Sequence, residues 1–158
     1  MLTRSKIIIV GKGGSGKDFL RKKLEARGFV YSISHTSRPK REGEVYGKDY
    51  KFVDESFFIN YPSKFYEIDK FNGWYYGTTI TEFKRANLII MTPNGIKKIR
   101  KDDRERCFII FIDPDKDVIR KRLMERGDVD SVDRRIESDN KDFFEFSDYD
   151  MRITNHDF

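Results

Sequence analysis

The chain has 158 residues, of which 37% are charged and 37% hydrophobic, the profile of one soluble globular domain that buries a core. Its single cysteine excludes an internal disulfide framework and suits a reducing cytoplasm, and no stretch approaches the roughly 20 apolar residues of a membrane span. The net charge of +5 indicates acidic partners, a class that includes nucleotides, nucleic acids and anionic membranes.

The first predicted elements are a strand, a glycine-rich loop and a helix. Residues 6–10, KIIIV, are apolar and β-branched, as in a buried parallel strand. Residues 17–27 place apolar side chains on one face of a helix, which Gly28 ends. A second strand is predicted at 29–34. This order makes the loop after the first strand the first candidate for a functional site.

The loop, residues 10–20, reads VGKGGSGKDFL and nearly fills the phosphate-binding pattern G-x-x-x-x-G-K-[ST]. Its glycines let backbone N–H groups turn inward, and these groups bind phosphate oxygens together with the helix N-terminus. Lys17 would bridge the β- and γ-phosphates of a nucleotide; the alternative is a chance glycine turn. The predicted ATP-binding residues of the loop are Gly11, Lys12, Gly13, Gly14, Ser15, Gly16, Lys17 and Asp18.

Asp18 stands where the pattern has a hydroxyl residue. A carboxylate in the first turn of a helix is stabilised by the helix dipole by roughly 0.3–1 kcal/mol, so Asp18 could simply cap the helix. It could equally hold Mg²⁺, directly or through water, because magnesium prefers hard oxygen ligands. The two roles are compatible, and both stay open.

The middle of the chain, residues 35–82, is rich in Tyr, Gly, Lys and Phe and predicts an inserted, mostly β lobe with one short helix near 54–60. Apolar strands return at 87–92 and 107–112, and a short strand is predicted at 149–155. The predicted helices of this half are 93–104, 115–126 and 133–146. Buried strands that alternate with helices indicate an α/β fold with a parallel sheet covered on both faces.

Four blocks of sequence resemble the guanylate kinase family, in the family's order. The segment 31–53, YSISHTSRPKREGEVYGKDYKFV, is similar to S-x-T-[ST]-R-x-x-R-x-G-E-x-x-G-x-D-Y-x-F, and 65–79, FYEIDKFNGWYYGTT, to F-x-E-x-x-x-[FY]-x-G-x-Y-Y-G-[ST]. The pattern R-L-x-x-R-G, where the family's lid begins, lies in 120–128, and Y-D-x-x-[IV]-x-N-x-D lies at 149–157. With the phosphate loop, the resemblance covers essentially the whole chain.

The resemblance implies the fold of the P-loop nucleoside monophosphate kinases. We expect a parallel core sheet flanked by helices, an inserted mixed-β acceptor-binding lobe and a short lid. The expected parts of this single domain, 1–158, are a core at 1–33, 83–121 and 135–158, a lobe at 34–82 and a lid at 122–134. The implied activity is the ATP-dependent phosphorylation of GMP, dGMP or both, with Mg²⁺, in the cytoplasm.

The expected acceptor site follows residue by residue from the matched motifs. Two arginines would bind the dianionic phosphate of a nucleoside monophosphate bidentately. Glu67 falls on the carboxylate that accepts from N1–H and N2–H₂ of guanine, while Ser34 and Thr78 fall on hydroxyls that contact guanine O6. The predicted GMP-binding residues are Ser34, Arg38, Arg41, Tyr50, Glu67, Tyr76 and Thr78. Taken singly, the arginines could belong to a solvated loop and the tyrosines to strand packing.

Transfer to a phosphate oxygen needs positioning and charge neutralisation more than a general base. By resemblance, three arginines belong to the lid and its hinge, and Asn155 takes the place of the asparagine that contacts the adenine of ATP. The predicted catalytic residues are Lys17, Arg41, Arg122, Arg126 and Arg135, and the predicted metal ligand is Asp18. The implied partners are ATP and GMP or dGMP, without nucleic acid or membrane; the oligomeric state stays open.

Two departures from the family's pattern stand out. Ile90 and Thr92 occupy the positions of an acidic D-x-D pair after the third core strand. This loss predicts less strict guanine selectivity and an altered metal geometry, and the carboxylate gained at Asp18 could exchange for one of those lost. The chain also ends at Phe158, where the family usually continues into a helix, so we expect a C-terminally short member.

Two other functions compete. Ribose 1,5-bisphosphate phosphokinases resemble guanylate kinases, can carry Gly-Lys-Asp in the loop and lack the acidic pair, but they lose the block at 38–50 and the base-reading glutamate. Non-catalytic guanylate-kinase-like modules bind phosphopeptides in the acceptor pocket, but they typically have degraded phosphate loops. The intact loop and acceptor block therefore favour a nucleotide kinase.

Overall fold

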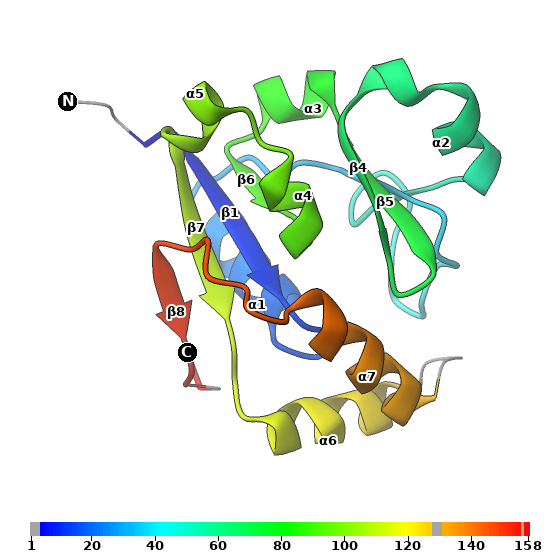
Figure 1. Cartoon of the computed structure of the whole chain (residues 1–158), viewed down its shortest axis with the longest axis vertical. Coiled ribbons are helices and arrows are strands. Elements are labelled where there is room, and N and C mark those ends of the chain that lie inside the picture. The colour runs from blue at the N-terminus through cyan, green and yellow to red at the C-terminus, as the bar shows by residue number, and fades with distance from the viewer. Residues whose placement is uncertain (1–3, 128–130, 156) are drawn as a thin grey trace.

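The computed structural model of the chain describes residues 4–127, 131–155 and 157–158. Its core is a four-stranded sheet of order β6-β1-β7-β8, in which every pairing is parallel (Figure 1). The strands are β1 (Lys6–Gly11), β6 (Leu88–Ile90), β7 (Cys107–Ile112) and β8 (Met151–Ile153). The predicted parallel core sheet is confirmed.

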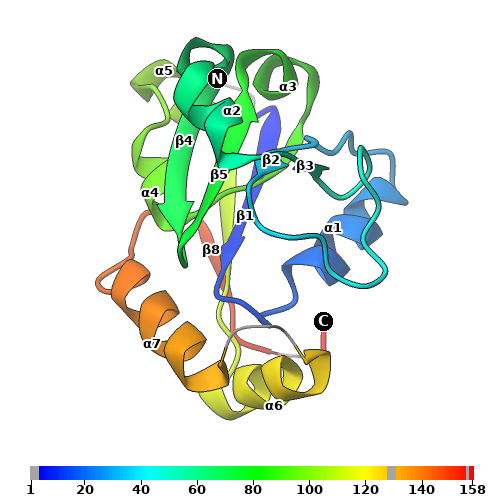
Figure 2. The same ribbon diagram turned by 90° about the vertical axis from the view of Figure 1, so that its right-hand side faces the viewer.

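Both faces of β1 are buried, because successive side chains of a strand point to opposite faces of the sheet. Ile8 belongs to one apolar cluster, and Ile9 belongs to another that includes Leu20 and Leu24. These two leucines come from α1 (Lys17–Glu25), which follows the phosphate loop. Helices thus cover both faces of the sheet, with α1 on one side of β1 and α7 (Val132–Asp142) on the other (Figure 2).

The predicted strand at 29–34 is wrong. Only Tyr31 forms a bridge, an isolated parallel one to Leu88. Other backbone N–H groups of this segment donate to side chains instead: Val30 to Asn87 Oδ1 at 2.7 Å and Ile33 to Glu82 Oε2 at 2.8 Å. Ser32 donates to the carbonyl oxygen of Leu88 at 2.8 Å and Leu88 donates to that of Val30 at 3.1 Å, so the segment lies beside β6 but makes only this one bridge and no regular strand.

The predicted helix at 93–104 is in fact two short helices, α4 (Pro93–Lys97) and α5 (Lys101–Arg104). They are separated where Arg100 adopts an extended backbone, with φ −61° and ψ 146°. The break allows Ile99 to remain buried in the core, with 9% of its surface exposed. Helix propensity alone does not decide where such a charged segment breaks, because tertiary contacts compete with it.

The second sheet has the order β3-β2-β5-β4 and mixes parallel with antiparallel pairs, as the predicted mixed-β lobe requires. Its strands are β2 (His35–Thr36), β3 (Lys51–Phe52), β4 (Phe65–Phe71) and β5 (Trp74–Thr79). Between and after them lie α2 (Glu55–Asn60), the 3₁₀ helix η1 (Pro62–Lys64) and α3 (Ile80–Arg85). Helix α2 confirms the short helix predicted near 54–60.

Two further helices, α6 (Lys116–Arg126) and α7 (Val132–Asp142), lie near the carboxyl end of β1 (Figure 1). The lid expected at 122–134 includes residues 128–130, and the expected core includes 1–3 and 156; these positions lie outside the described residues. Among the described residues, none of the helices is long and apolar enough to cross a membrane.

Candidate functional site

A cavity of about 690 Å³ opens at the carboxyl end of β1 and is lined by residues of the phosphate loop, the second sheet and both α6 and α7. Cavities of this size typically hold small molecules. It brings together most of the predicted site residues, namely Gly11, Gly13, Gly14, Ser15, Gly16, Lys17, Asp18, Ser34, Arg38, Arg41, Tyr50, Glu67, Tyr76, Arg122, Arg126 and Arg135.

Three predicted residues do not line this cavity. Lys12 donates from Nζ to Asn140 Oδ1 of α7 at 3.0 Å. Asn155 accepts from the backbone N–H of Asp157 at 3.0 Å, and it is Asp157, with Phe158, that reaches the cavity. Thr78 is buried behind Glu67. An adenine contact by Asn155 and an O6 contact by Thr78 therefore stay predictions.

The phosphate loop needs its glycines for two different reasons. Gly16, the N-cap of α1, lies in the left-handed region, with φ 107°, where a residue with a Cβ is strained. A Cβ on Gly11 would lie 2.5 Å from Ser15 Oγ and 2.8 Å from the carbonyl oxygen of Ile112, so no side chain fits. The backbone thus wraps tightly around the N-terminus of α1, an arrangement that binds anions.

Lys17 lies across this loop. Its Nζ donates to the carbonyl oxygens of Gly11 at 2.7 Å and Lys12 at 3.0 Å. Burial lowers the pKa of Lys17 to about 8, although Asp139 and Asp18 act in the opposite direction. A bound polyphosphate would add negative charge beside Nζ and raise this pKa again.

Helix α7 places an acidic residue against the loop, and this residue is not among those predicted for the site. Asp139 is 1% exposed, and its Oδ2 accepts a hydrogen bond of 2.9 Å from the backbone N–H of Gly13. A Cβ on Gly13 would lie 2.8 Å from Nε of Arg135, four residues earlier on the same helix. The i, i+4 spacing after a predicted hinge arginine was the only signal in the sequence.

Helix α6 also contacts the loop. Arg122 donates from Nη1 to the carbonyl oxygens of Gly14 and Ser15, each at 3.2 Å. The loop is therefore held by α6 and α7 together, and both helices carry predicted catalytic arginines.

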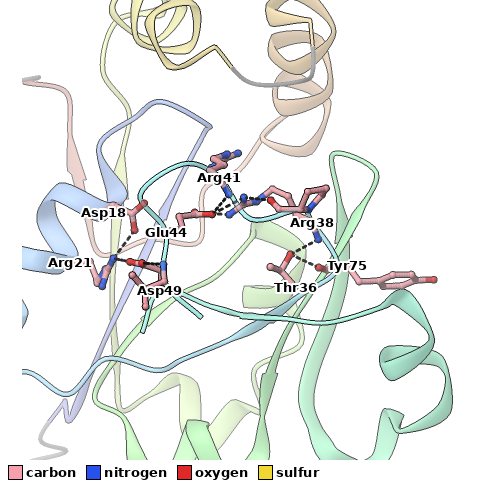
Figure 3. A network of polar contacts seen from close by, with 10 residues as sticks. Asp18, Arg21, Thr36, Arg38, Arg41, Glu44, Asp49 and Tyr75 are labelled. Carbon is pink, nitrogen blue, oxygen red and sulfur yellow. Dashed lines mark hydrogen bonds and ion pairs between the residues drawn. The ribbon is translucent and has the colours of Figure 1, made fainter. Parts of the chain in front are cut away.

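Asp18 lies at the edge of the cavity, with 60% of its side chain exposed. The N-cap of α1 is Gly16, and the Asp18 carboxylate accepts from Arg21 Nη2 at 3.4 Å (Figure 3). The described residues hold no group of three or more His, Cys, Asp or Glu side chains that could bind a metal ion. An exposed carboxylate beside a phosphate loop nevertheless fits Mg²⁺, which usually takes one or two carboxylates together with phosphate and water oxygens.

Arg21 is almost fully buried, with 2% of its side chain exposed. It donates to Asp49 Oδ1 at 2.7 Å and to Glu25 Oε2 at 2.9 Å, and its guanidinium lies 4.6 Å from the ring centroid of Tyr31. Figure 3 shows this guanidinium between α1 and the segment that carries Asp49.

Arg38 is held in a bidentate pair with Glu44, at 3.0 and 2.8 Å (Figure 3). Glu44 also accepts from the backbone N–H of Arg41 at 2.8 Å. Burial alone would raise the pKa of Glu44, but these hydrogen bonds outweigh it and lower the pKa. A partly buried carboxylate therefore holds the guanidinium of Arg38 and the backbone of Arg41, two residues predicted to bind the acceptor phosphate.

Glu67 is 7% exposed and lines the cavity from β4. Its Oε1 accepts from both the backbone N–H and the hydroxyl of Thr78, at 3.0 and 2.8 Å. Burial raises the pKa of Glu67 to about 7, and the neighbouring Asp69 adds to this increase. Its Oε2 lies over Gly95, where a Cβ would approach it to 2.9 Å. Thr78 thus holds Oε1 of Glu67, the residue predicted to bind the base, but does not bind Oε2.

Comparison with known proteins agrees with the resemblance seen in the motifs. The family model described as guanylate kinase matches residues 3–158. The guanylate kinase of Legionella pneumophila (strain Paris) is 35% identical over 164 residues, which cover 96% of this chain and 78% of that protein. The guanylate kinase of Lactobacillus acidophilus is 32% identical over 163 residues, covering 94% of this chain and 79% of that protein.

A solved structure shows the same fold. The crystal structure of guanylate kinase from Anaplasma phagocytophilum superposes with a TM-score of 0.71 at 24% identity, and the match covers 99% of this chain and 79% of that one. The predicted fold class, with its parallel core sheet and mixed second sheet, is therefore confirmed.

Proposed function

This chain belongs to the guanylate kinase family, and on that premise we propose that it transfers the γ-phosphoryl group of ATP to GMP, dGMP or both. An acceptor phosphate oxygen forms a bond to the γ-phosphorus while the bond from that phosphorus to the β–γ bridging oxygen breaks. The products are ADP and a guanine nucleoside diphosphate. The observation that carries the proposal is the single cavity that joins the phosphate loop to Arg38, Arg41 and Glu67.

The donor half of the proposed site is the phosphate loop with the helices that contact it. Backbone N–H groups of the loop and Lys17 bind the β- and γ-phosphates. Charge on the transferred group is neutralised by arginines that line the cavity, and Arg41 reaches the same space from the acceptor side. The proposed set is Lys17, Arg41, Arg122, Arg126 and Arg135. No residue needs to remove a proton, because the attacking atom is already a phosphate oxygen.

The acceptor half of the proposed site binds both the phosphate and the base of the nucleotide. Arg38 and Arg41, with the hydroxyls of Tyr50 and Tyr76, bind the monophosphate. Glu67 accepts from N1–H and N2–H₂ of guanine with the oxygen that Thr78 leaves free. Adenine has no hydrogen on N1, so adenine would leave the buried carboxylate unpaired, a strong basis for discrimination.

Asp18 is the residue that would hold Mg²⁺ in this site. When bound, the ion supplies positive charge to the β- and γ-phosphate oxygens. Asp18 contributes an exposed carboxylate at the start of α1, and its contact with Arg21 at 3.4 Å is long enough to exchange for another partner. We also propose a cytoplasmic location, supported by the single buried cysteine and by the nucleotide substrates.

Transfer of labelled phosphate tests the proposal directly. We expect ATP labelled at the γ-phosphate to convert GMP into labelled diphosphate, and the variant Lys17→Met to lose at least about 10³-fold of the rate. Label that is released only as inorganic phosphate would instead show an ATPase. Label on ribose 1,5-bisphosphate but not on GMP would favour the competing kinase, and binding of GMP without turnover would favour a non-catalytic module.

A further inference from the structure

Thr92, which stands where the family has an acidic residue, lies against a carboxylate from β4 of the second sheet. Thr92 donates its hydroxyl hydrogen to Asp69 Oδ2 at 2.7 Å. Asp69 lies on β4 two residues after Glu67, so both carboxylates point to the same face of the strand. Asp69 is 8% exposed, and the cavity is lined by Thr92 and Glu67 but not by Asp69 itself. A buried carboxylate therefore stands directly behind Thr92.

The hydroxyl of Thr92 has few bonding directions left. A hydroxyl offers one hydrogen and two lone pairs. Its hydrogen is given to Asp69, and one lone pair accepts from the backbone N–H of Gly95 at 3.0 Å, which caps α4. What remains is one lone pair, so Thr92 presents an acceptor to the cavity and cannot also donate.

This acceptor lies beside the base-reading carboxylate. A Cβ on Gly95 would be 2.9 Å from Oε2 of Glu67 and 3.2 Å from Oγ1 of Thr92, so both oxygens crowd the same glycine. Two adjacent acceptors match a group that carries two hydrogens on one nitrogen. The 2-amino group of guanine is such a group, and hypoxanthine, the base of IMP, lacks it.

We propose that Asp69 is a specificity-determining positioning residue: it fixes the Thr92 hydroxyl as an acceptor for the 2-amino group of the acceptor purine. Glu67 takes N1–H and one hydrogen of the 2-amino group, and Thr92 takes the other. Without Asp69 the hydroxyl hydrogen is free to turn toward the base and meet the amino group donor to donor. This proposal rests on the proposed function and names how the same site selects GMP over IMP.

The test is the ratio of kcat/KM for GMP to kcat/KM for IMP, which does not depend on the fraction of folded enzyme. We expect Asp69→Ala and Thr92→Val each to lower this ratio by about 10-fold or more, with the KM for ATP unchanged. The conservative controls Asp69→Asn, whose amide oxygen still accepts, and Thr92→Ser should keep most of the selectivity. The double variant Asp69→Ala/Thr92→Val should be no less selective than either single variant, because the two act as one unit.

Different results would overturn the proposed kinase function and the proposed role of Asp69. A wild-type protein that phosphorylates neither GMP nor dGMP would overturn the proposed function. A wild-type protein that phosphorylates both equally well would overturn the role of Asp69 while leaving the kinase activity standing. A strong preference for GMP that is unchanged in Asp69→Ala and in Thr92→Val would also overturn the role of Asp69. So would a double variant whose loss of selectivity is the sum of the losses in the two single variants.

Discussion

Arg21 Nη2 donates a 2.7 Å hydrogen bond to Asp49 Oδ1, and this bond joins α1 to the segment that carries Arg41 and Glu44. Asp49 also accepts from the backbone N–H of Val45 at 2.8 Å through its other oxygen. One buried guanidinium therefore links the helix of the phosphate loop to the acceptor side of the cavity. Figure 3 shows that Asp18 lies at one end of this network.

Loss of Asp49 should destabilise the protein and weaken the acceptor site. Because Asp49→Ala removes a partner of a cation that is 2% exposed, we expect the free energy of unfolding to fall by about 3 kcal/mol. The KM for GMP should rise more than the KM for ATP, since the freed segment carries the acceptor residues. Urea unfolding and steady-state kinetics measure the two effects. Equal increases in both KM values would contradict a link to the acceptor side.

Asp18 provides the matched comparison, because its carboxylate contacts the same guanidinium but is 60% exposed. Exposed ion pairs contribute little, so Asp18→Ala should cost less than about 1 kcal/mol of stability. Its effect should appear instead in the Mg²⁺ concentration needed for half-maximal activity, which we expect to rise several-fold. The variant Asp18→Ser, which restores the hydroxyl of the loop pattern, should keep a normal requirement. An unchanged Mg²⁺ requirement in Asp18→Ala would exclude Asp18 as a ligand.

Glu67 should make GMP recognition depend on pH. Burial raises the pKa of Glu67 to about 7, and only the ionised carboxylate accepts both guanine hydrogens. The KM for GMP should therefore fall as pH rises from 6 to 8. In Glu67→Gln we expect kcat/KM for GMP to drop by about 10²-fold or more and this pH dependence to vanish. A pH dependence retained in Glu67→Gln would assign it to another group.

The same carboxyl predicts an opposite trend in stability. The pKa of Glu67 in the folded protein is above the ordinary value of 4.5. The contribution of this group to the free energy of unfolding is therefore fully present below pH 4.5 and is lost as the pH rises through about 7. The loss amounts to about 3 kcal/mol, at about 1.4 kcal/mol for each pKa unit. Unfolding free energies of wild type and Glu67→Gln, measured from pH 5 to 8, should diverge in favour of the variant. Parallel curves would contradict the raised pKa.

Lys17 should take up a proton when ATP binds. Burial lowers the pKa of Lys17 to about 8 in the free protein, and a triphosphate beside Nζ raises it. At pH 8 we therefore expect uptake of about half a proton for each ATP bound. Calorimetry in buffers of different ionisation enthalpy measures this uptake, and Lys17→Met is the control. The same uptake in wild type and Lys17→Met would show that Lys17 is already fully protonated.

The phosphate loop and the core sheet could be predicted because their signals are local. The run KIIIV, the glycines and Lys17 lie within twelve consecutive residues, and each has a direct physical reason. The predicted acceptor residues Arg38 and Glu67 rest on the resemblance to a family. The hydrogen bonds that position them could not be predicted from the sequence. For example, Thr78 faces Glu67 only because β4 pairs with β5.

Two carboxylates that could not be predicted contact residues far away in the sequence. Asp139 contacts Gly13 across 126 positions, and Asp69 contacts Thr92 across 23. Apart from the four-residue spacing between Arg135 and Asp139, nothing in the local pattern marks these two carboxylates. From the sequence, the carboxylate gained at Asp18 could exchange for one of the acids missing at Ile90 and Thr92. The fold places a different acid, Asp69, against Thr92, and this relationship depends on how β4 packs beside the start of α4.

The most direct test of the account is ADP release by the wild-type protein with GMP, dGMP, IMP, AMP and ribose 1,5-bisphosphate as acceptors, each measured with Mg²⁺ and ATP. We expect turnover with GMP, dGMP or both, weaker turnover with IMP, and rates with AMP and ribose 1,5-bisphosphate at the level of the Lys17→Met control. Absence of turnover with either guanine nucleotide, under conditions where the protein is folded and binds ATP, would contradict it.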